Sequence, residues 1–283
     1  MQESKFEDSR NLSPVGDPTG DESSLTVEQA IANLRGSDLG LRYYAAWWLG
    51  RFRVATPEAI EALIESLADE SDRTAKGGYP LRRNAARALG KLSNTQAVPA
   101  LIQCLECEDF YVREAAAQSL GMLGDRSCIP ALMNFLVGGL ETAQPEPGSI
   151  HLPHPYNAIL EALGVLGATQ AVPLIEPFLS HPSEPVQYAA ARAMYELTQN
   201  PVYAERLVQA LSGDKLVLRR AAMADLGAIG YLPAAEAIAN TLAENSLKLI
   251  ALKGILERQG QHTALPTLSE SSIRVMTLMD ELL

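Results

Sequence analysis

The sequence predicts an all-α solenoid, a row of helix pairs stacked side by side, and three observations support this fold class. The chain is rich in Ala and Leu and contains only 6% Phe, Trp and Tyr, a composition that suits closely packed helices better than sheets. A short motif of small residues ending in Leu-Gly recurs along its 283 residues. A second amphipathic helix follows each copy, and a lone helix pair cannot bury both of its faces.

The recurring motif sets the period of the stack. Five copies end at Gly50, Gly90, Gly121, Gly164 and Gly227, and a degenerate copy spans 189–195. The intervals between equivalent positions are 40, 31, 43, 31 and 32 residues, so two intervals exceed a base period of 31 by 9 and 12 residues. A constant period over six copies is the signature of a repeat protein. We therefore expect a HEAT-like, armadillo-type α-solenoid of about six to seven helical hairpins.

The second helix of each hairpin has a regular apolar face. In the segment 97–105, Val98, Leu101, Ile102 and Leu105 follow the i, i+3, i+4, i+7 spacing of one helix face. A proline stands near the start of this helix in three copies, where a missing N–H costs little. These prolines are Pro99, Pro130 and Pro173.

The remaining segments define the domain organisation. Residues 1–24 contain six acids, two bases and no periodic apolar pattern, so we expect a disordered acidic tail. Residues 25–283 are expected to form the solenoid, with the two long intervals producing Gly- and Pro-rich loop insertions near 69–80 and 138–155. Insertions in solenoids often emerge on the binding face.

Composition excludes several classes of function. A formal net charge of −11 argues against a nucleic-acid binder, which usually carries a basic stripe. Apolar runs are too short to span a bilayer, and the first residues lack the apolar core of a secretory signal. Three cysteines without a second ligand pair at zinc spacing predict a reducing, cytoplasmic compartment and no metal site. A redox role of the Cys104–Cys107 pair stays an alternative to inert thiols.

Aligning the copies turns each helical position into a column. Two columns four residues apart share one face of the motif helices, which in curved solenoids is generally the concave side. One column contains Tyr43, Arg83, Glu114, Asn157, Tyr188 and Arg220; the other contains Trp47, Arg87, Gln118, Glu161, Arg192 and Ala224. The large polar and aromatic residues of these columns are the candidates for contact with a ligand or a partner.

The aromatic pair at the start of this surface has two interpretations. An exposed Tyr43 and Trp47 would form a partner hot spot or a site for an aromatic ligand. Alternatively, Trp47 packs under the N-terminal helix as a cap. Tyr44 and Trp48 fall in more buried columns, and we expect both in the core.

Two residues are candidates for acid–base chemistry. Asp225 replaces a small residue in the column of Ala88, Ser119 and Ala162, which would desolvate its carboxylate. His154 lies in the second insertion near His151, and either imidazole could act as an acid, a base or a ligand. Because a third ligand is not evident nearby, we expect both to be solvent-exposed loop histidines, with a chemical role as the alternative.

Two sequence runs carry a resemblance to a known family. The run 41–54, LRYYAAWWLGRFRV, has a double Tyr and a double Trp that generic HEAT repeats lack. Together with the run 77–90, GGYPLRRNAARALG, it closely resembles the E subunit, or alpha subunit, of the cyanobacterial E/F-type phycobilin lyases. The resemblance covers residues 25 to about 260.

The resemblance implies a function. Such a chain pairs with a second HEAT-repeat subunit of F type, and the heterodimer attaches phycocyanobilin through a thioether to a cysteine of the phycocyanin alpha subunit. Phycocyanobilin would be a substrate and not a permanently bound cofactor. A plain lyase is favoured over an isomerising one, since isomerisation is associated with the other subunit. A non-catalytic scaffold or adaptor in phycobilisome assembly or degradation, and a soluble chromophore carrier, stay open as alternatives.

Overall fold

The computed structural model describes residues 25–145, 151–260 and 269–283, and throughout these residues the regular structure is helical. Seven of the described helices pack one against the next in a single row, in which the recurring motif forms the first six. This row consists of α2 (Leu39–Arg51), α4 (Pro80–Lys91), α6 (Phe110–Leu123), α9 (Tyr156–Val165), α11 (Glu184–Thr198), α13 (Leu216–Ile229) and α15 (Asn245–Gly260). The prediction of an all-α HEAT-like solenoid of six to seven hairpins is confirmed.

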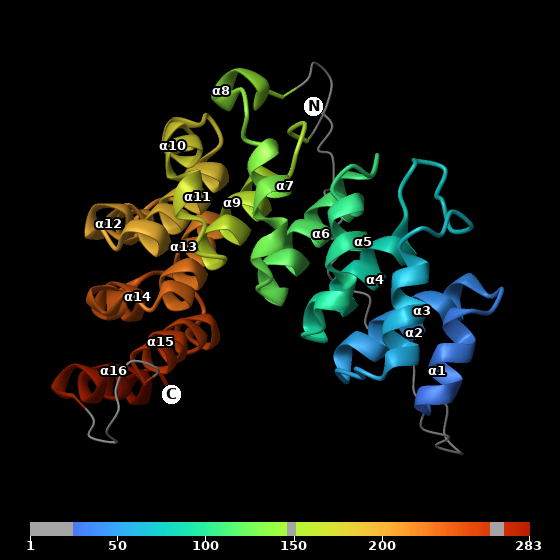
Figure 1. Cartoon of the computed structure of the whole chain (residues 1–283). Coiled ribbons are helices and arrows are strands. Elements are labelled where there is room, and N and C mark those ends of the chain that lie inside the picture. Colours follow the sequence, from blue (N-terminus) through green and yellow to red (C-terminus); the bar gives the residue numbers. More distant parts are fainter. Residues whose placement is uncertain (1–24, 146–150, 261–268) are drawn as a thin grey trace, which may run out of the picture.

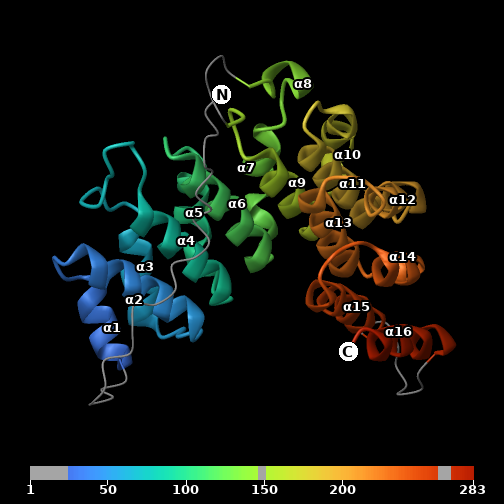
Figure 2. The same ribbon diagram turned by 180° about the vertical axis from the view of Figure 1, so that it is seen from behind.

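A second layer of helices backs the row. It consists of α1 (Val27–Leu34), α3 (Pro57–Ser66), α5 (Val98–Cys104), α7 (Ile129–Asn134), α8 (Gly139–Thr142), α10 (Val172–Ile175), α12 (Pro201–Ala210), α14 (Ala235–Asn240) and α16 (Glu270–Glu281). Single 3-10 turns open four of these hairpin arms: η1 (Thr95–Ala97), η2 (Arg126–Cys128), η3 (Thr169–Ala171) and η5 (Leu232–Ala234), while η4 (Glu176–Ser180) follows α10. Figures 1 and 2 show both layers bent into an arch, with the α2–α15 row on its inner side.

The Leu-Gly ending of the motif has a direct packing cause. A Cβ built on Gly50 would lie 2.7 Å from the Cα of Ala88 in the next inner helix, and one on Gly90 would lie 2.9 Å from the Cα of Ser119. Side chains cannot be accommodated at such separations, because the neighbouring atom is backbone. Glycine facing a small residue therefore sets the close spacing of the inner helices.

The row is interrupted between α11 and α13. Here Tyr195 occupies the glycine position of the motif, and Asp225 occupies the position of the small residue that faces it. The buried apolar residues divide into two clusters near this junction, one running from Ala30 to Met194 and the other from Ala191 to Leu278. The stack is thus one solenoid whose apolar core has a break.

The insertions are ordered by contacts with the stack. Within 69–80, Asp72 accepts a hydrogen bond from the Leu81 backbone N–H, and the Tyr79 hydroxyl donates to Glu108 over 2.7 Å. The second insertion, expected to be a loop throughout 138–155, includes the short helix α8, and buried His181 hydrogen-bonds the carbonyl of Ala143 over 2.9 Å. Residues 146–150 and the expected acidic tail at 1–24 lie outside the described residues.

Candidate functional site

The inner row presents the two predicted columns much as the alignment indicated. Trp47, Arg87 and Gln118 are exposed in one column, and Tyr43 is exposed in the other. Their partners further along the row are half-buried: Arg83, Glu114 and Tyr188 in the Tyr43 column, Glu161 and Arg192 in the Trp47 column. These residues therefore form a continuous inner surface that changes from exposed and aromatic to half-buried and charged. What they bind stays a prediction.

The aromatic end of this surface is more exposed than predicted. Trp47 and Tyr43 are 46% and 38% exposed, so the described residues leave a large part of both side chains uncovered. Tyr44 was expected in the core, but it is 48% exposed, and its ring lies 5.5 Å from that of Trp47. Asn84, at the equivalent position of α4, faces the preceding inner helix and donates to the Tyr43 carbonyl. Because α2 is the first helix of the inner row, Tyr44 has no such helix among the described residues to cover it. Trp48, also expected in the core, is partly buried against it and packs on Phe52.

A second aromatic group, which the column argument missed, follows at α6. The Arg83 guanidinium lies over the ring of Tyr111, with 5.6 Å between its Cζ and the ring centroid, and Tyr111 is 42% exposed. Phe110 stacks on His151, whose ring belongs to the second insertion. Phe110 and Tyr111 stand in the first turn of α6, outside both columns, so a column-wise comparison could not find them. The insertion thus reaches the edge of the inner surface, as insertions in solenoids often do.

Charged residues gather at the break in the apolar core. Arg192 on α11 donates to the Asp225 carboxylate on α13 over 2.9 Å, and its guanidinium lies 3.7 Å from a carboxylate oxygen of Glu161 on α9. Glu196, one turn along α11, is the third carboxylate, at 3.5 Å. Three helices thereby surround one cation with three acids, and we call these four residues the Arg192 cluster.

Burial changes the protonation of this cluster. Burial, reinforced by repulsion from Asp225, raises the pKa of Glu161 to about 7. Burial also raises the pKa of Asp225, against the opposing effect of the Arg192 charge, and the pKa of Glu196 for the same reason. The sequence predicted a desolvated Asp225, and its 9% exposure confirms that burial. Its pairing with Arg192 was not predicted, because two separate columns had to be brought together.

His154, the other acid–base candidate, lies elsewhere. Its ring packs against Phe135 and buried Tyr156, and its Nδ1 is buried without a hydrogen-bond partner among the described residues. Burial, with the nearby charge of Arg113, lowers the pKa of His154, so the imidazole is neutral at pH 7. The structure does not join His154 to Asp225 in one site, and a half-buried ring replaces the expected exposed loop histidine.

Hollows of the surface lie on either side of the Arg192 cluster. One cavity of about 310 Å³ is bordered by Glu161 and Arg192 together with Gln118, Met122 and Val165. Another, of about 380 Å³, includes Glu196 among its lining residues. The charged cluster therefore borders one cavity on the inner surface and a second one at the C-terminal ends of α9, α11 and α13.

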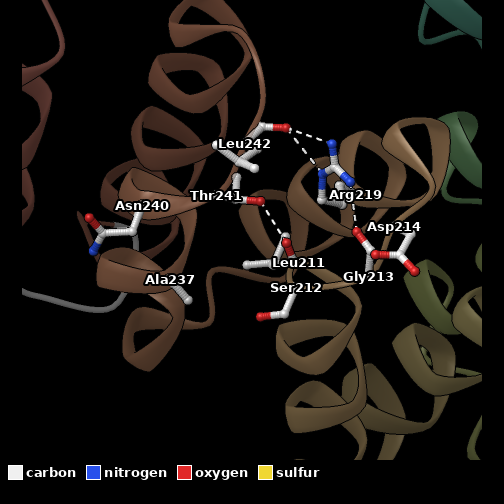
Figure 3. Close-up of a pocket in the computed structure, with 9 residues that line it drawn as sticks. All are labelled: Leu211, Ser212, Gly213, Asp214, Arg219, Ala237, Asn240, Thr241 and Leu242. Carbon is white, nitrogen blue, oxygen red and sulfur yellow. Dashed lines mark hydrogen bonds between the residues drawn. The ribbon is translucent and has the colours of Figure 1, made fainter.

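A larger hollow of about 510 Å³ lies between the loops that precede α13 and α15 (Figure 3). Arg219 points into it but donates to the carbonyls of Gly213 and Leu242, and the Thr241 hydroxyl donates to Leu211 over 2.7 Å (Figure 3). The polar groups of this hollow thus hydrogen-bond one loop of the chain to another. They connect neighbouring hairpins and leave few donors or acceptors for a ligand. The described residues contain no group of His, Cys, Asp or Glu side chains that could bind a metal ion. They also contain no helix long and apolar enough to cross a membrane.

Family comparisons place this arrangement in a class. The family described as HEAT repeats matches residues 78–141 and 154–227, and the PBS lyase HEAT-like repeat matches residues 41–69. The latter segment carries the exposed aromatic residues of α2. The fold and its inner surface thus define a HEAT-repeat protein of the kind found in phycobilisome lyases.

Individual relatives define the family more narrowly. The phycocyanobilin lyase subunit alpha of Nostoc sp. is 64% identical over 94% of this chain and 97% of its own length, and that of Microchaete diplosiphon is 63% identical over 100% and 95%. A chain in the solved complex of CpcE and CpcF of phycocyanin lyase from Nostoc sp. matches with a TM-score of 0.86 and 63% identity, over 96% of this chain and 100% of that one. This chain belongs to the phycocyanobilin lyase subunit alpha family, which confirms the identification made from 41–54 and 77–90.

Proposed function

We propose that this chain is one half of a heterodimeric lyase that attaches phycocyanobilin through a thioether to a cysteine of the phycocyanin alpha subunit. The support is the named relatives, one of which was solved together with CpcF, and the exposed inner surface. The single observation that carries the proposal is the aromatic and polar row along the concave side of the arch, which runs from exposed Trp47 to half-buried Arg192.

The chemistry suits a client that supplies the nucleophile. Thioether formation adds the client S–H across the ethylidene double bond of the bilin, so that sulfur bonds to one carbon and hydrogen to the other, without oxidation or a leaving group. This chain's own Cys104 and Cys128 are buried, and burial raises the pKa of each thiol to about 11. Neither is a ready thiolate at pH 7. The lyase would then contribute positioning and stereocontrol.

The inner surface offers complementary groups for such a pigment. A bilin is a flat tetrapyrrole with two propionates. Arg83 and exposed Arg87 are cations for the carboxylates, and Tyr43 and Trp47 provide flat apolar walls. The F-type partner would cover the open side of the arch and share the aromatic end of the surface.

Reconstitution tests this function. Co-expression with the F-type subunit, phycocyanobilin and the phycocyanin alpha chain should give a covalent product, visible as zinc-induced fluorescence in denaturing gels, only when both subunits are present. Binding of free bilin without transfer would instead indicate a chromophore carrier. Binding of the client without bilin would indicate a scaffold.

Trp47→Ala should weaken product formation or heterodimer assembly by about 30-fold, the scale of a lost hot-spot residue. Phe52→Ala provides the matched control, because Phe52 is 60% exposed just after the C-terminal end of the same helix and lies outside the two columns. Equal activity of the two variants would remove Trp47 from the site.

A further inference from the structure

The Arg192 cluster contains more negative charge than its own cation can balance. Asp225 and Arg192 are both largely buried, with side-chain exposures of 13% and 15%, and Glu196 is 11% exposed. Arg258 on α15 adds a second positive charge near Glu196, but three ionised carboxylates would still leave one charge that the two guanidiniums do not compensate. Burying such charges is costly, so the cluster must hold protons or receive a donor from outside.

The cluster also contains an unused acceptor. The Oε2 atom of Glu196 is buried and lacks a hydrogen-bond partner among the described residues. It stands where a Cβ on Gly164 would come within 2.2 Å, so the glycine of α9 provides its space. Both residues line the 380 Å³ cavity. A buried carboxylate oxygen without a donor, at the wall of a cavity, indicates a ligand that brings an N–H or O–H group.

Glu161 is the acid that the inner surface can reach. Its side chain keeps 35% exposure while contacting Arg192, and it borders the 310 Å³ cavity with the apolar side chains of Met122 and Val165. The charged groups that face it come from each packed inner helix, while α7 carries no titratable residue. They are Glu114 on α6, Arg192 and Glu196 on α11, and Asp225 on α13.

We infer that the Arg192 cluster is a proton-holding subsite for the pyrrole nitrogens of a linear tetrapyrrole, with Glu161 in contact with the pigment. Arg192 and Asp225 are positioning residues that fix the carboxyl group of Glu161. This inference rests on the proposed function, and it adds where the pigment binds and which residue protonates it. The apolar wall of Met122 and Val165 beside Glu161 suits a flat ligand that is apolar at its faces and carries N–H donors at its edge. The unused Glu196 oxygen stands at the neighbouring 380 Å³ cavity, on the other side of the cluster.

The protonation step balances without a further reactant. The neutral Glu161 carboxyl gives its proton to a pyrrole nitrogen, which makes the conjugated pigment cationic and its ethylidene carbon more electrophilic. The client sulfur bonds to that carbon, the π electrons move into the conjugated system, and the thiol proton returns the carboxyl group to its acid form. Transfer of the nitrogen-bound proton to the neighbouring ring carbon completes the addition.

The test uses the complete heterodimer with phycocyanobilin and the phycocyanin alpha chain, and compares Glu161→Gln with wild type. The variant should lower the attachment rate on the order of 100-fold, the usual scale of a lost general acid. It should also abolish the long-wavelength absorption of the protonated, bound bilin near pH 7, which a merely structural role would not change. Glu65→Gln is the matched control, because Glu65 forms an exposed ion pair with Arg35 on the outer layer.

Asp225→Asn gives an independent arm. It removes a like charge that faces Glu161, so the spectral transition of the bound bilin should move to lower pH, and the attachment rate at pH 7 should fall with it. A Glu161→Gln enzyme with an unchanged rate and an unchanged spectral titration would overturn the inference and leave the lyase function standing. A wild-type heterodimer that transfers no bilin would overturn both.

Discussion

The inner row follows two different packing rules, one between α2 and α9 and another between α11 and α13. In the first part a glycine faces Ala or Ser on the next helix, as Gly121 faces Ala162 at 3.1 Å between the added Cβ and the Cα. At the second junction Tyr195 and Asp225 replace the two small residues. Tyr195 packs its ring edge-on to Tyr231, and Asp225 binds Arg192. Apolar close contact is exchanged there for an aromatic contact and a charge network.

In a repeat protein, function is expected at the positions that depart from the repeat. Positions that follow the repeat rule are explained by packing, and a position that breaks it needs another cause. At Asp225 the exchange destroys a close apolar contact and buries a carboxylate, which costs stability unless it is paired. The 380 Å³ cavity lies at this junction, and the Arg192 cluster extends from it to the 310 Å³ cavity, so the irregular junction is the chemically distinctive part of the row.

The largest effect that tests this comparison is expected for Arg192→Met. Removing the cation leaves three carboxylates without their partner, and breaking a buried ion network typically costs about 3 kcal/mol or more. The loss of unfolding free energy, measured by urea titration of the full chain, should be larger at pH 8 than at pH 5, where the carboxyl groups can take up protons. Arg87→Met, at an exposed position of the same column, should change stability by less than about 0.5 kcal/mol. An equal loss at both pH values would show that the guanidinium acts through packing alone.

A smaller effect should follow from breaking the other packing rule. Gly50→Val places a side chain 2.7 Å from the Ala88 Cα, and overpacking of this kind costs about 2 kcal/mol. Urea unfolding of the variant beside Ala224→Val, an exposed position on α13, separates the close contact from the general cost of a β-branched residue. Similar losses in the two variants would contradict the argument that glycine sets the helix spacing.

Sequence reasoning reached the regular features more readily than the irregular ones. The period, the hairpins and the exposed Trp47 column follow from local patterns that each copy repeats. The placement of Tyr44 failed because the column average does not show how far α2, near the end of the row, leaves a ring uncovered. Phe110 and Tyr111 were missed because their role depends on His151 from an insertion.

The contacts within the Arg192 cluster were likewise not predictable from local sequence patterns. Arg192 and Asp225 were each singled out, for different reasons, yet their contact depends on the distance between α11 and α13. Glu196 was not considered at all, because it falls in the degenerate copy where Tyr195 replaces the motif glycine. The i, i+4 spacing of Arg192 and Glu196 could have predicted their ion pair, because residues one turn apart share a helix face.

The smallest expected effect concerns Glu161 and the pH dependence of stability. Its folded-state pKa of about 7 lies above the ordinary 4.5, so the folded chain binds this proton more tightly than the unfolded chain. The resulting stabilisation is present below pH 4.5 and is lost as pH rises through 7. Allowing for the partial exposure of the side chain, Glu161→Gln should flatten the decline in unfolding free energy between pH 5 and pH 8 by about 1 kcal/mol relative to wild type. Urea titrations at the two pH values measure this difference in unfolding free energy, and Glu65→Gln is expected to follow wild type.

Parallel curves for all three proteins would mean that Glu161 is solvated like a surface acid. The irregular junction would then lack the protonated carboxyl group that distinguishes it from the glycine-packed part of the row.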